Sequence, residues 1–258
     1  MKTIGVYNIK GGVGKSTTAV NLACLAGRGG ETTLLWDLDP QGAAGYYLGE
    51  SGEERKGSGR LVRGNEGLRD LSVSTHFPGL DLIASRFSYR RLDFHLQKHA
   101  HPRSVLSKLL APLAHFYRWV FLDCPPGITL LSENVFRAVD LLLVPVIPTP
   151  LSLRAFEEIV LFYERKGLEK ARVLPFFSLV ERRKRIHRTT MEIFTAREGR
   201  VCHASIPSLS EIERMALTRR PVAFYKPRSE AGRAYAALWD EVRADADSRA
   251  RRAGNRTS

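Results

Sequence analysis

A stretch rich in lysine and glycine, K-G-G-V-G-K-S-T, holds the residues whose types and spacing best fit a chemical task. It runs from Lys10 to Thr17. Its glycines allow backbone conformations that a side chain forbids, so successive N–H groups can turn inward around an anion. Lys15 can reach the outer phosphates of a nucleotide, and Ser16 can offer its hydroxyl to Mg²⁺. This stretch predicts a phosphate-binding loop, with a plain Gly-rich turn as the alternative.

The sequence on either side of the loop supplies the elements that must position it. A short apolar run ends at Ile9, and an apolar-periodic segment containing Val20 and Leu25 follows the loop. The order strand, tight turn, helix places the positive end of a helix dipole at the loop. The general pattern G-x-x-x-x-G-K-[ST] requires glycine at position 9. Because this chain has Ile9 there, followed by Lys10, the loop is a variant.

Two further apolar runs end in carboxylates. In T-T-L-L-W-D-L-D-P-Q-G a buried strand over 33–36 is followed by Asp37 and Asp39, and R-W-V-F-L-D-C-P-P-G ends a second strand at Asp123. Open α/β sheets bind ligands at the carboxyl ends of their strands. Carboxylates at that edge can hold metal-bound water or orient an attacking water beside a Mg-phosphate. Asp37 and Asp39 can instead cap a turn or a helix.

Composition limits the class of protein. The 258 residues fit one large α/β domain, and no run of 18 or more apolar residues exists, which argues against a signal peptide or a membrane span. Cys24, Cys124 and Cys202 lack metal-ligand spacing and predict reduced thiols in a cytosolic protein. The net charge of +13 favours a polyanionic partner. The Gly-rich, basic stretch 50–69 predicts a loop or mobile insertion.

The three motifs, in this order, resemble those of the ParA/MinD family of deviant Walker A P-loop ATPases, and within it the ParA/Soj-like partition ATPases. The resemblance covers roughly residues 2–242, including a closing segment R-R-P-V-A-F-Y-K-P-R-S-E-A-G. It implies a single α/β domain over 1–242, of the P-loop NTPase type, with a mostly parallel twisted sheet flanked by helices on both faces. Residues 243–258 have only alanines as apolar residues and predict a polar, disordered tail.

The resemblance also implies roles for individual residues. Lys10 matches the signature lysine that reaches the nucleotide of the other subunit. Asp39 matches the residue that positions the hydrolytic water, Asp37 a metal-side support, and Asp123 the Walker B aspartate. Pro207 lies in a turn that packs against adenine in the family, although a plain strand-terminating proline explains it nearly as well.

The expected site is therefore made up as follows. The expected catalytic residues are Lys10, Lys15 and Asp39; the ATP-binding residues are Gly11, Gly12, Val13, Gly14, Lys15, Ser16, Thr17 and Pro207; the Mg²⁺ ligands are Ser16, Asp37 and Asp123.

The function that the resemblance implies is a slow Mg-ATP-dependent ATPase that closes as a homodimer. It would act in DNA partition or cargo positioning through sequence-nonspecific DNA binding, with a ParB-like or cargo adaptor protein that stimulates hydrolysis. Such a protein is expected in the cytoplasm, associated with the nucleoid. The expected DNA-contacting patch contains Arg182, Arg183, Lys184, Arg185, Arg188, Arg219 and Arg220.

Three alternatives belong to related proteins. A MinD-like membrane-associated ATPase is disfavoured because the stretch 243–258 offers no bulky apolar residue to a lipid surface. An iron–sulfur reductase would need a cysteine three residues after Asp123, where Pro126 stands. A small-molecule amidase or ligase of the cobyrinate or dethiobiotin type remains open, and substrate-dependent ADP release would reveal it.

Overall fold

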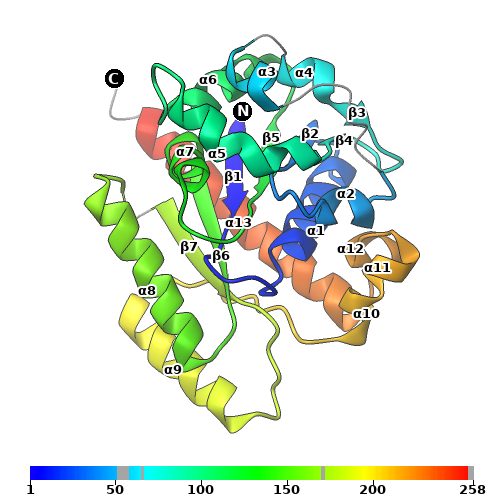
Figure 1. Cartoon of the computed structure of the whole chain (residues 1–258). Helices are drawn as coiled ribbons and strands as arrows, with labels where there is room; N and C mark the ends of the chain where they lie inside the picture. The colour runs from blue at the N-terminus through cyan, green and yellow to red at the C-terminus, as the bar shows by residue number, and fades with distance from the viewer. Residues whose placement is uncertain (51–57, 65–66, 170–171, 255–258) are drawn as a thin grey trace.

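A twisted, mostly parallel sheet forms the centre of the structure, a computed structural model that describes residues 1–50, 58–64, 67–169 and 172–254 (Figure 1). Within these residues the sheet has seven strands in the order β3-β4-β2-β5-β1-β6-β7. Every neighbouring pair is parallel except β3 and β4. The strands are β1 (Lys2–Val6), β2 (Thr33–Asp37), β3 (Val73–Ser74), β4 (Leu80–Ile83), β5 (Trp119–Asp123), β6 (Leu141–Val146) and β7 (Val173–Phe177).

Helices cover both faces of this sheet, as parallel strands joined by helical crossovers require. One face packs against α1 (Lys15–Arg28), α2 (Ala43–Tyr47), α10 (Ser210–Glu213), α11 (Met215–Thr218), α12 (Val222–Tyr225) and α13 (Glu230–Gly254). The other packs against α3 (Ser58–Val62), α4 (Leu68–Leu71), η1 (Phe87–Arg91), α5 (Leu92–Gln97), α6 (Val105–Leu110), η2 (Ala111–His115), α7 (Leu130–Ala138), α8 (Pro150–Arg165) and α9 (Arg185–Glu198). The α/β fold class predicted from the sequence is confirmed.

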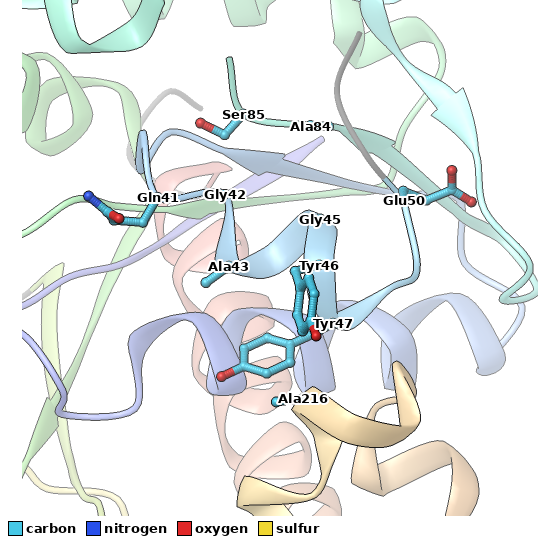
Figure 2. Close-up of a pocket in the computed structure, with 10 residues that line it drawn as sticks. All are labelled: Gln41, Gly42, Ala43, Gly45, Tyr46, Tyr47, Glu50, Ala84, Ser85 and Ala216. Atoms are coloured by element: carbon cyan, nitrogen blue, oxygen red, sulfur yellow. The ribbon is translucent and has the colours of Figure 1, made fainter. Parts of the chain in front are cut away.

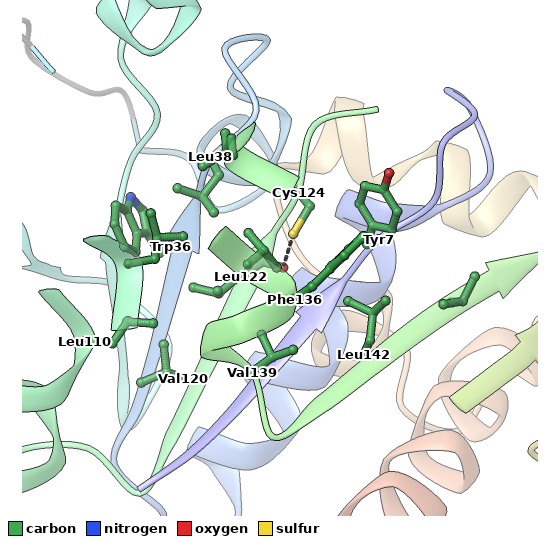
Figure 3. Packing of buried hydrophobic residues seen from close by; sticks show 14 of the residues in the cluster. Tyr7, Trp36, Leu38, Leu110, Val120, Leu122, Cys124, Phe136, Val139 and Leu142 are labelled. Carbon is green, nitrogen blue, oxygen red and sulfur yellow. Dashed lines mark hydrogen bonds between the residues drawn. The ribbon is translucent and has the colours of Figure 1, made fainter. Parts of the chain in front are cut away.

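Successive residues of the central strands point into different cores. Leu35 and Phe121 join the core on the α1 side of the sheet, whereas Trp36 and Leu122 join the core on the α7 side. Figure 3 shows the second core packed around Phe136. Both faces of these strands are therefore dry, which is why the apolar runs in the sequence show no polar alternation.

A proline occurs within β6, although proline is confined to places where no ladder hydrogen bond is needed. Leu143 accepts a hydrogen bond from the Tyr7 N–H on the β1 side of the strand, and Val146 accepts one from Ser178 on the β7 side. Pro145 has the same orientation as Leu143, but β1 has ended at that level. Its missing N–H therefore breaks no strand pairing, and its carbonyl accepts a bond of 2.7 Å from the Asn8 side chain.

The C-terminal helix is longer than the sequence predicted. We expected a disordered tail from residue 243, but α13 continues to Gly254 and buries Ala246; residues 255–258 lie outside the described part. Asp247 forms ion pairs with Lys2 and Arg118, and Asp245 pairs with Arg200 at 2.5 Å. Long-range ion pairs hold this stretch on the sheet, and composition alone does not reveal such pairs.

The basic stretch 50–69 is also more ordered than predicted. Residues 58–62 and 68–71 form α3 and α4, which bury Leu61, Val62 and Leu68 in the α7-side core. The rest of the predicted loop at 51–57 and 65–66 lies outside the described residues. None of the helices among the described residues combines the length and the apolar composition that a membrane span requires.

Candidate functional site

The loop between β1 and α1 has the backbone shape that the glycines predict. Gly12 and Gly14 adopt positive φ angles of 69° and 89°, a region that favours glycine. A Cβ on Gly14 would lie 2.8 Å from the Ser178 hydroxyl oxygen, so the position is closed to larger residues for two reasons. The loop then leads directly into α1, whose first N–H groups point toward it.

Asn8 fixes the start of this loop, and sequence reasoning missed it. Its side chain is fully buried and donates to the Pro145 carbonyl at 2.7 Å. The Asn8 side-chain oxygen Oδ1 accepts the Lys10 backbone N–H at 2.9 Å. Asn8 thus links the loop to β6. The signal in the sequence is a polar residue directly after an apolar strand, which by itself is too common to indicate a role.

The two lysines of the loop differ in their surroundings. Lys15 is only 7% exposed, and its ammonium donates to the Lys10 carbonyl at 2.9 Å. Burial lowers the pKa of Lys15, an effect that the Asp123 and Asp39 carboxylates partly offset. Lys10 is half-exposed, and among the described residues its ammonium makes no ion pair. Lys15 therefore points into the site, whereas Lys10 is free to reach a group outside its own loop.

The three predicted carboxylates gather at one edge of the sheet. Asp37 and Asp123 are register partners at the ends of β2 and β5, and Asp39 follows two residues later. Both Asp123 oxygens are buried and have no hydrogen-bond partner of ordinary length among the described residues. Burial raises the pKa of Asp123 well above its ordinary value and Asp37 raises it further, while Ser16 and Lys15 lower it.

Asp37 serves as a backbone acceptor. Its Oδ1 accepts the Asp39 N–H at 3.1 Å, and its Oδ2 accepts the N–H groups of Ala44 and Gly45 at 3.0 and 3.2 Å. It therefore holds the start of α2, which agrees with the capping alternative. Burial raises the pKa of Asp37 to about 7 despite these bonds. Asp39 lies nearer the surface, and its Oδ1 accepts the Gln41 N–H at 3.0 Å.

The donor set of this edge fits a magnesium ion. Mg²⁺ prefers oxygen ligands and is usually held by one or two carboxylates together with phosphates and waters. The Asp123 carboxylate has free lone pairs, and the Ser16 hydroxyl is close enough to affect its pKa. In the described residues no three His, Cys, Asp or Glu side chains form a metal cage. Any metal here would thus be completed by ligands from outside the protein.

The turn after Asp123 is hydrogen-bonded to the segment that joins β1 to the phosphate-binding loop. The Tyr7 hydroxyl donates to the Gly127 carbonyl at 2.9 Å, and the Gly127 N–H donates to Ile9 at 3.1 Å. Gly127 has φ of 90°, which a side chain would disfavour. Cys124, next to Asp123, is fully buried, and burial raises the pKa of its thiol. Because of these hydrogen bonds, a movement of the phosphate-binding loop would also displace the 124–127 turn.

Pro207 lies across the sheet end from the three aspartates. It is buried and forms an isolated parallel bridge with Val180. Leu179, just before Val180, has a positive φ of 53°, which is unusual for a branched residue. The structure thus shows Pro207 as part of a fixed turn. Whether it contacts a base is not tested by this geometry, and the assignment stays a prediction.

A cavity of about 430 Å³ lies beside the predicted site. It is flanked by α2, the end of β4 and Ala216, and Figure 2 shows Tyr46 and Tyr47 at its wall. Of the predicted site residues, none lines it. The predicted phosphate site is instead the open edge formed by the 10–17 loop and the three aspartates.

The predicted basic patch is divided between two surfaces. One group surrounds the start of α9 on the α7 side of the sheet, and the other follows α11 on the α1 side (Figure 1). All seven side chains are exposed. We name the first group, Arg182, Arg183, Lys184, Arg185 and Arg188, the α9 basic cluster, and the second, Arg219 and Arg220, the arginine turn.

Comparison with known proteins gives relatives along most of the chain. Residues 1–170 match the protein family described as an AAA domain. The chromosome partitioning protein ParA of Caulobacter vibrioides is 28% identical over 250 residues, which covers 94% of each chain.

Two solved structures have the same fold. A McdA variant of Cyanothece in complex with ATP superposes with a TM-score of 0.80, at 21% identity and coverage of 95% and 96% of the two chains. Cobyrinic acid a,c-diamide synthase of Mycobacterium smegmatis, with a bound ATP analogue and magnesium, gives 0.78, at 22% identity and 93% coverage of both chains. McdA and the diamide synthase share the fold of this chain, so the fold alone does not identify its reaction.

Proposed function

The chain belongs to the ParA/MinD family of P-loop ATPases, and from this premise we propose that it is a Mg-ATP-dependent dimerising switch that acts in DNA partition or cargo positioning. ATP would be both the substrate and the signal: the ATP-bound form closes and hydrolysis reopens it. The family membership supports ATPase activity of the ParA type. Dimerisation, DNA binding and the stimulating partner are the parts of this proposal that experiments must test.

The observation that carries the proposal is the fully buried Asp123 carboxylate: its oxygens have no hydrogen-bond partner of good geometry among the described residues, and Ser16 and Lys15 are near enough to lower its pKa. A buried carboxylate left unsatisfied costs free energy, so it indicates a ligand that completes it. Mg²⁺ bound to Asp123 and Ser16 would neutralise phosphate charge at the reacting centre. Asp37 would support this position through the start of α2, and the 11–17 backbone would bind the phosphates.

Each remaining residue has a distinct role in the proposed reaction. Lys15, buried in the loop, would bind the outer phosphates of its own nucleotide. Asp39, near the surface, would orient the attacking water and accept its proton. Lys10, whose ammonium is not engaged in an ion pair among the described residues, would reach the nucleotide of a second subunit. Pro207 would lie against the adenine ring.

The charge distribution supports DNA as the surface to which the dimer binds. The net charge is +13, and two exposed basic groups lie at the start of α9 and directly after α11. Lysine and arginine bind phosphates without reading bases. The logarithm of the binding constant then falls linearly with the logarithm of the salt concentration, with a slope of about −0.9 for each phosphate neutralised. A dimer would present each group twice. A ParB-like or cargo adaptor would stimulate an otherwise slow hydrolysis.

The test is DNA binding by fluorescence anisotropy over a salt series, with ATP, ADP or no nucleotide. The wild-type protein should bind duplexes of unrelated sequence more tightly with ATP than without it. In Lys15→Ala, DNA affinity in the presence of ATP should be at least about tenfold lower than in wild type, the range expected for the loss of a charged contact. Lys108→Ala, at an exposed position on α6, controls for the loss of one charge. Equal binding in all nucleotide states would overturn the proposal.

A further inference from the structure

The arginine turn has a backbone that its own sequence does not favour. Arg219 adopts a positive φ of 49°, and its N–H donates to the Met215 carbonyl at 2.9 Å. For a residue with a side chain this conformation costs free energy and persists only where the surroundings enforce it. Arg219 and Arg220 are both exposed, so the restraint has to come from other elements that hold the turn in place.

Asn21 provides a restraint from the helix that follows the phosphate-binding loop. It lies on α1 fewer than two helical turns beyond Lys15 and is fully buried. Its amide nitrogen donates to the Thr17 carbonyl at 2.7 Å and to the Met215 sulfur at 3.2 Å, and its oxygen accepts the Ala223 N–H at 2.9 Å. Met215 and Ala223 flank the arginine turn, so a single side chain joins α1 to both of its ends.

Tyr46 provides a second restraint from α2. The Arg219 guanidinium lies over the Tyr46 ring, 4.9 Å from its centroid. A Cβ placed on Gly49 would lie 3.9 Å from the Arg219 Cβ, which shows how closely the end of α2 approaches the turn. The other end of α2 is held by Asp37 through the Ala44 N–H. One short helix therefore joins the carboxylate edge of the site to the arginine turn.

We propose that Asn21 and Tyr46 are positioning residues that couple the arginine turn to the nucleotide site, so that ATP sets the geometry in which Arg219 and Arg220 meet DNA phosphates. This inference rests on the proposed function and adds the route by which the nucleotide acts on that surface. Any displacement of the phosphate-binding loop or of α2 is passed to the turn, because the connections are short and buried or stacked. The α9 basic cluster, on the other side of the sheet, lacks these two connections.

The test measures the ratio of DNA dissociation constants with ADP and with ATP for a set of variants, together with the ATP dissociation constant of each. A coupling of ordinary size gives the wild-type protein a ratio of about 5–150. Asn21→Ala and Tyr46→Leu should bring the ratio to within about twofold of 1 while changing ATP affinity by less than about threefold. Tyr46→Phe keeps the aromatic ring and should retain the wild-type ratio.

The matched control for Asn21 is Asn134, another fully buried asparagine. Asn134 makes hydrogen bonds to Val105, Leu106, Pro102 and Leu130, none of which touches the turn. Asn134→Ala should lower stability comparably and leave the ratio unchanged. If Asn21→Ala does not fold, Tyr46→Leu still decides the question, because Tyr46 is 48% exposed.

The outcomes separate the two proposals. Wild-type ratios in both Asn21→Ala and a folded Tyr46→Leu would overturn the inference and leave the proposed function intact. A wild-type ratio of 1 would overturn the proposed function itself, and the inference with it. Hydrogen exchange gives a second readout: ATP should slow exchange of amides 215–223 in the wild-type protein and in Asn134→Ala, but not in Asn21→Ala.

Discussion

Asp37 and Asp123 are register partners on adjacent parallel strands, and the Asp37 carboxylate adds to the effect of burial in raising the pKa of Asp123. Both carboxyl groups are fully buried. Asp37 is satisfied by three backbone N–H groups, whereas Asp123 receives no such bond among the described residues. Asp37 therefore has a structural role at this edge, whereas Asp123 is unsatisfied. We expect Asp123 to lower the stability of the nucleotide-free protein and to be needed for ligand binding.

The first prediction concerns the stability of the nucleotide-free protein. Asp123→Asn replaces a fully buried, unpaired carboxyl group with a neutral amide, so we expect the variant to unfold at higher urea concentration than wild type at pH 8 in EDTA. The gain should be about 1–3 kcal/mol, the range for an unsatisfied buried polar group. The same variant should lose Mg²⁺-dependent ATP binding. Asp240→Asn, exposed on α13, is the control, and a variant less stable than wild type at pH 8 would contradict the role of Asp123.

The pH dependence follows from the same pair. The folded-state pKa values of Asp37 and Asp123 are raised, to about 7 for Asp37. Between the unfolded value of about 4 and these raised values, the folded state binds more protons, so the free energy of unfolding falls as pH rises. Urea unfolding at pH 5, 6, 7 and 8 should show this fall in wild type and a shallower one in Asp123→Asn. Equal slopes of unfolding free energy against pH in the two proteins would show that Asp123 does not contribute to the pH dependence.

Asp39→Ala should separate binding from hydrolysis. Loss of a general base lowers the rate by about 10²–10⁴-fold, while the phosphate-binding loop is unchanged. The variant should therefore accumulate as an ATP-bound dimer, visible by light scattering after size exclusion, with phosphate release measured in parallel. Asp70→Ala, at an exposed position on α4, should behave as wild type. If the variant stays monomeric in saturating Mg-ATP, ATP does not drive dimerisation, and nucleotide binding is the only part of the proposed switch that remains.

Lys10→Ala should act on the dimer more than on the monomer. Because the Lys10 ammonium makes no ion pair among the described residues, its loss should change ATP affinity by less than about threefold. Dimer formation and hydrolysis should both be strongly reduced. Titration with a fluorescent ATP analogue measures the first quantity and light scattering the second. A dimer as stable as that of wild type would show that Lys10 does not cross the interface.

The C-terminal helix should be part of the folded unit. Asp247→Ala leaves the Lys2 ammonium, whose side chain is 9% exposed, without its carboxylate partner. The loss should lower the free energy of unfolding by about 1–3 kcal/mol. Asp240→Ala on the same helix removes only an exposed pair with Arg243 and should cost less than about 1 kcal/mol. Equal effects in thermal unfolding would mean that α13 is not anchored through Lys2.

Much of the fold could be predicted because the signal is local. Each parallel strand is a short, mostly buried segment of four to six residues, and the three nucleotide motifs occur at the ends of β1, β2 and β5. The order of the motifs along the chain then predicts that Lys15, Asp37 and Asp123 meet at one sheet edge, and the structure does place them together. The strand ends differ from the prediction by a few residues because backbone pairing, not composition, sets them.

What the sequence did not reveal depends on contacts between distant residues. Asn8 and Asn21 look like ordinary polar residues, and only their partners 137 and 202 positions away show that they fix the loop and the arginine turn. Residues 243–254 have a polar composition, but their carboxylates meet Lys2, Arg118 and Arg200. The basic patch was predicted as one surface, but its two stretches, 182–188 and 219–220, lie on opposite faces of the sheet, and only the fold shows this.

Because all three cysteines are buried, the surface of the protein offers no native thiol to thiol-specific reagents. Cys24, Cys124 and Cys202 are buried, and burial raises the pKa of each thiol, to about 12 for Cys24. Thiolates are the reactive form, so maleimide dyes should leave the native protein unlabelled. A Leu217→Cys variant, changed at a position that is 84% exposed and two residues before Arg219, would therefore accept a fluorophore at one place only. Its emission would report the motion of that turn in real time, without removal of any native cysteine.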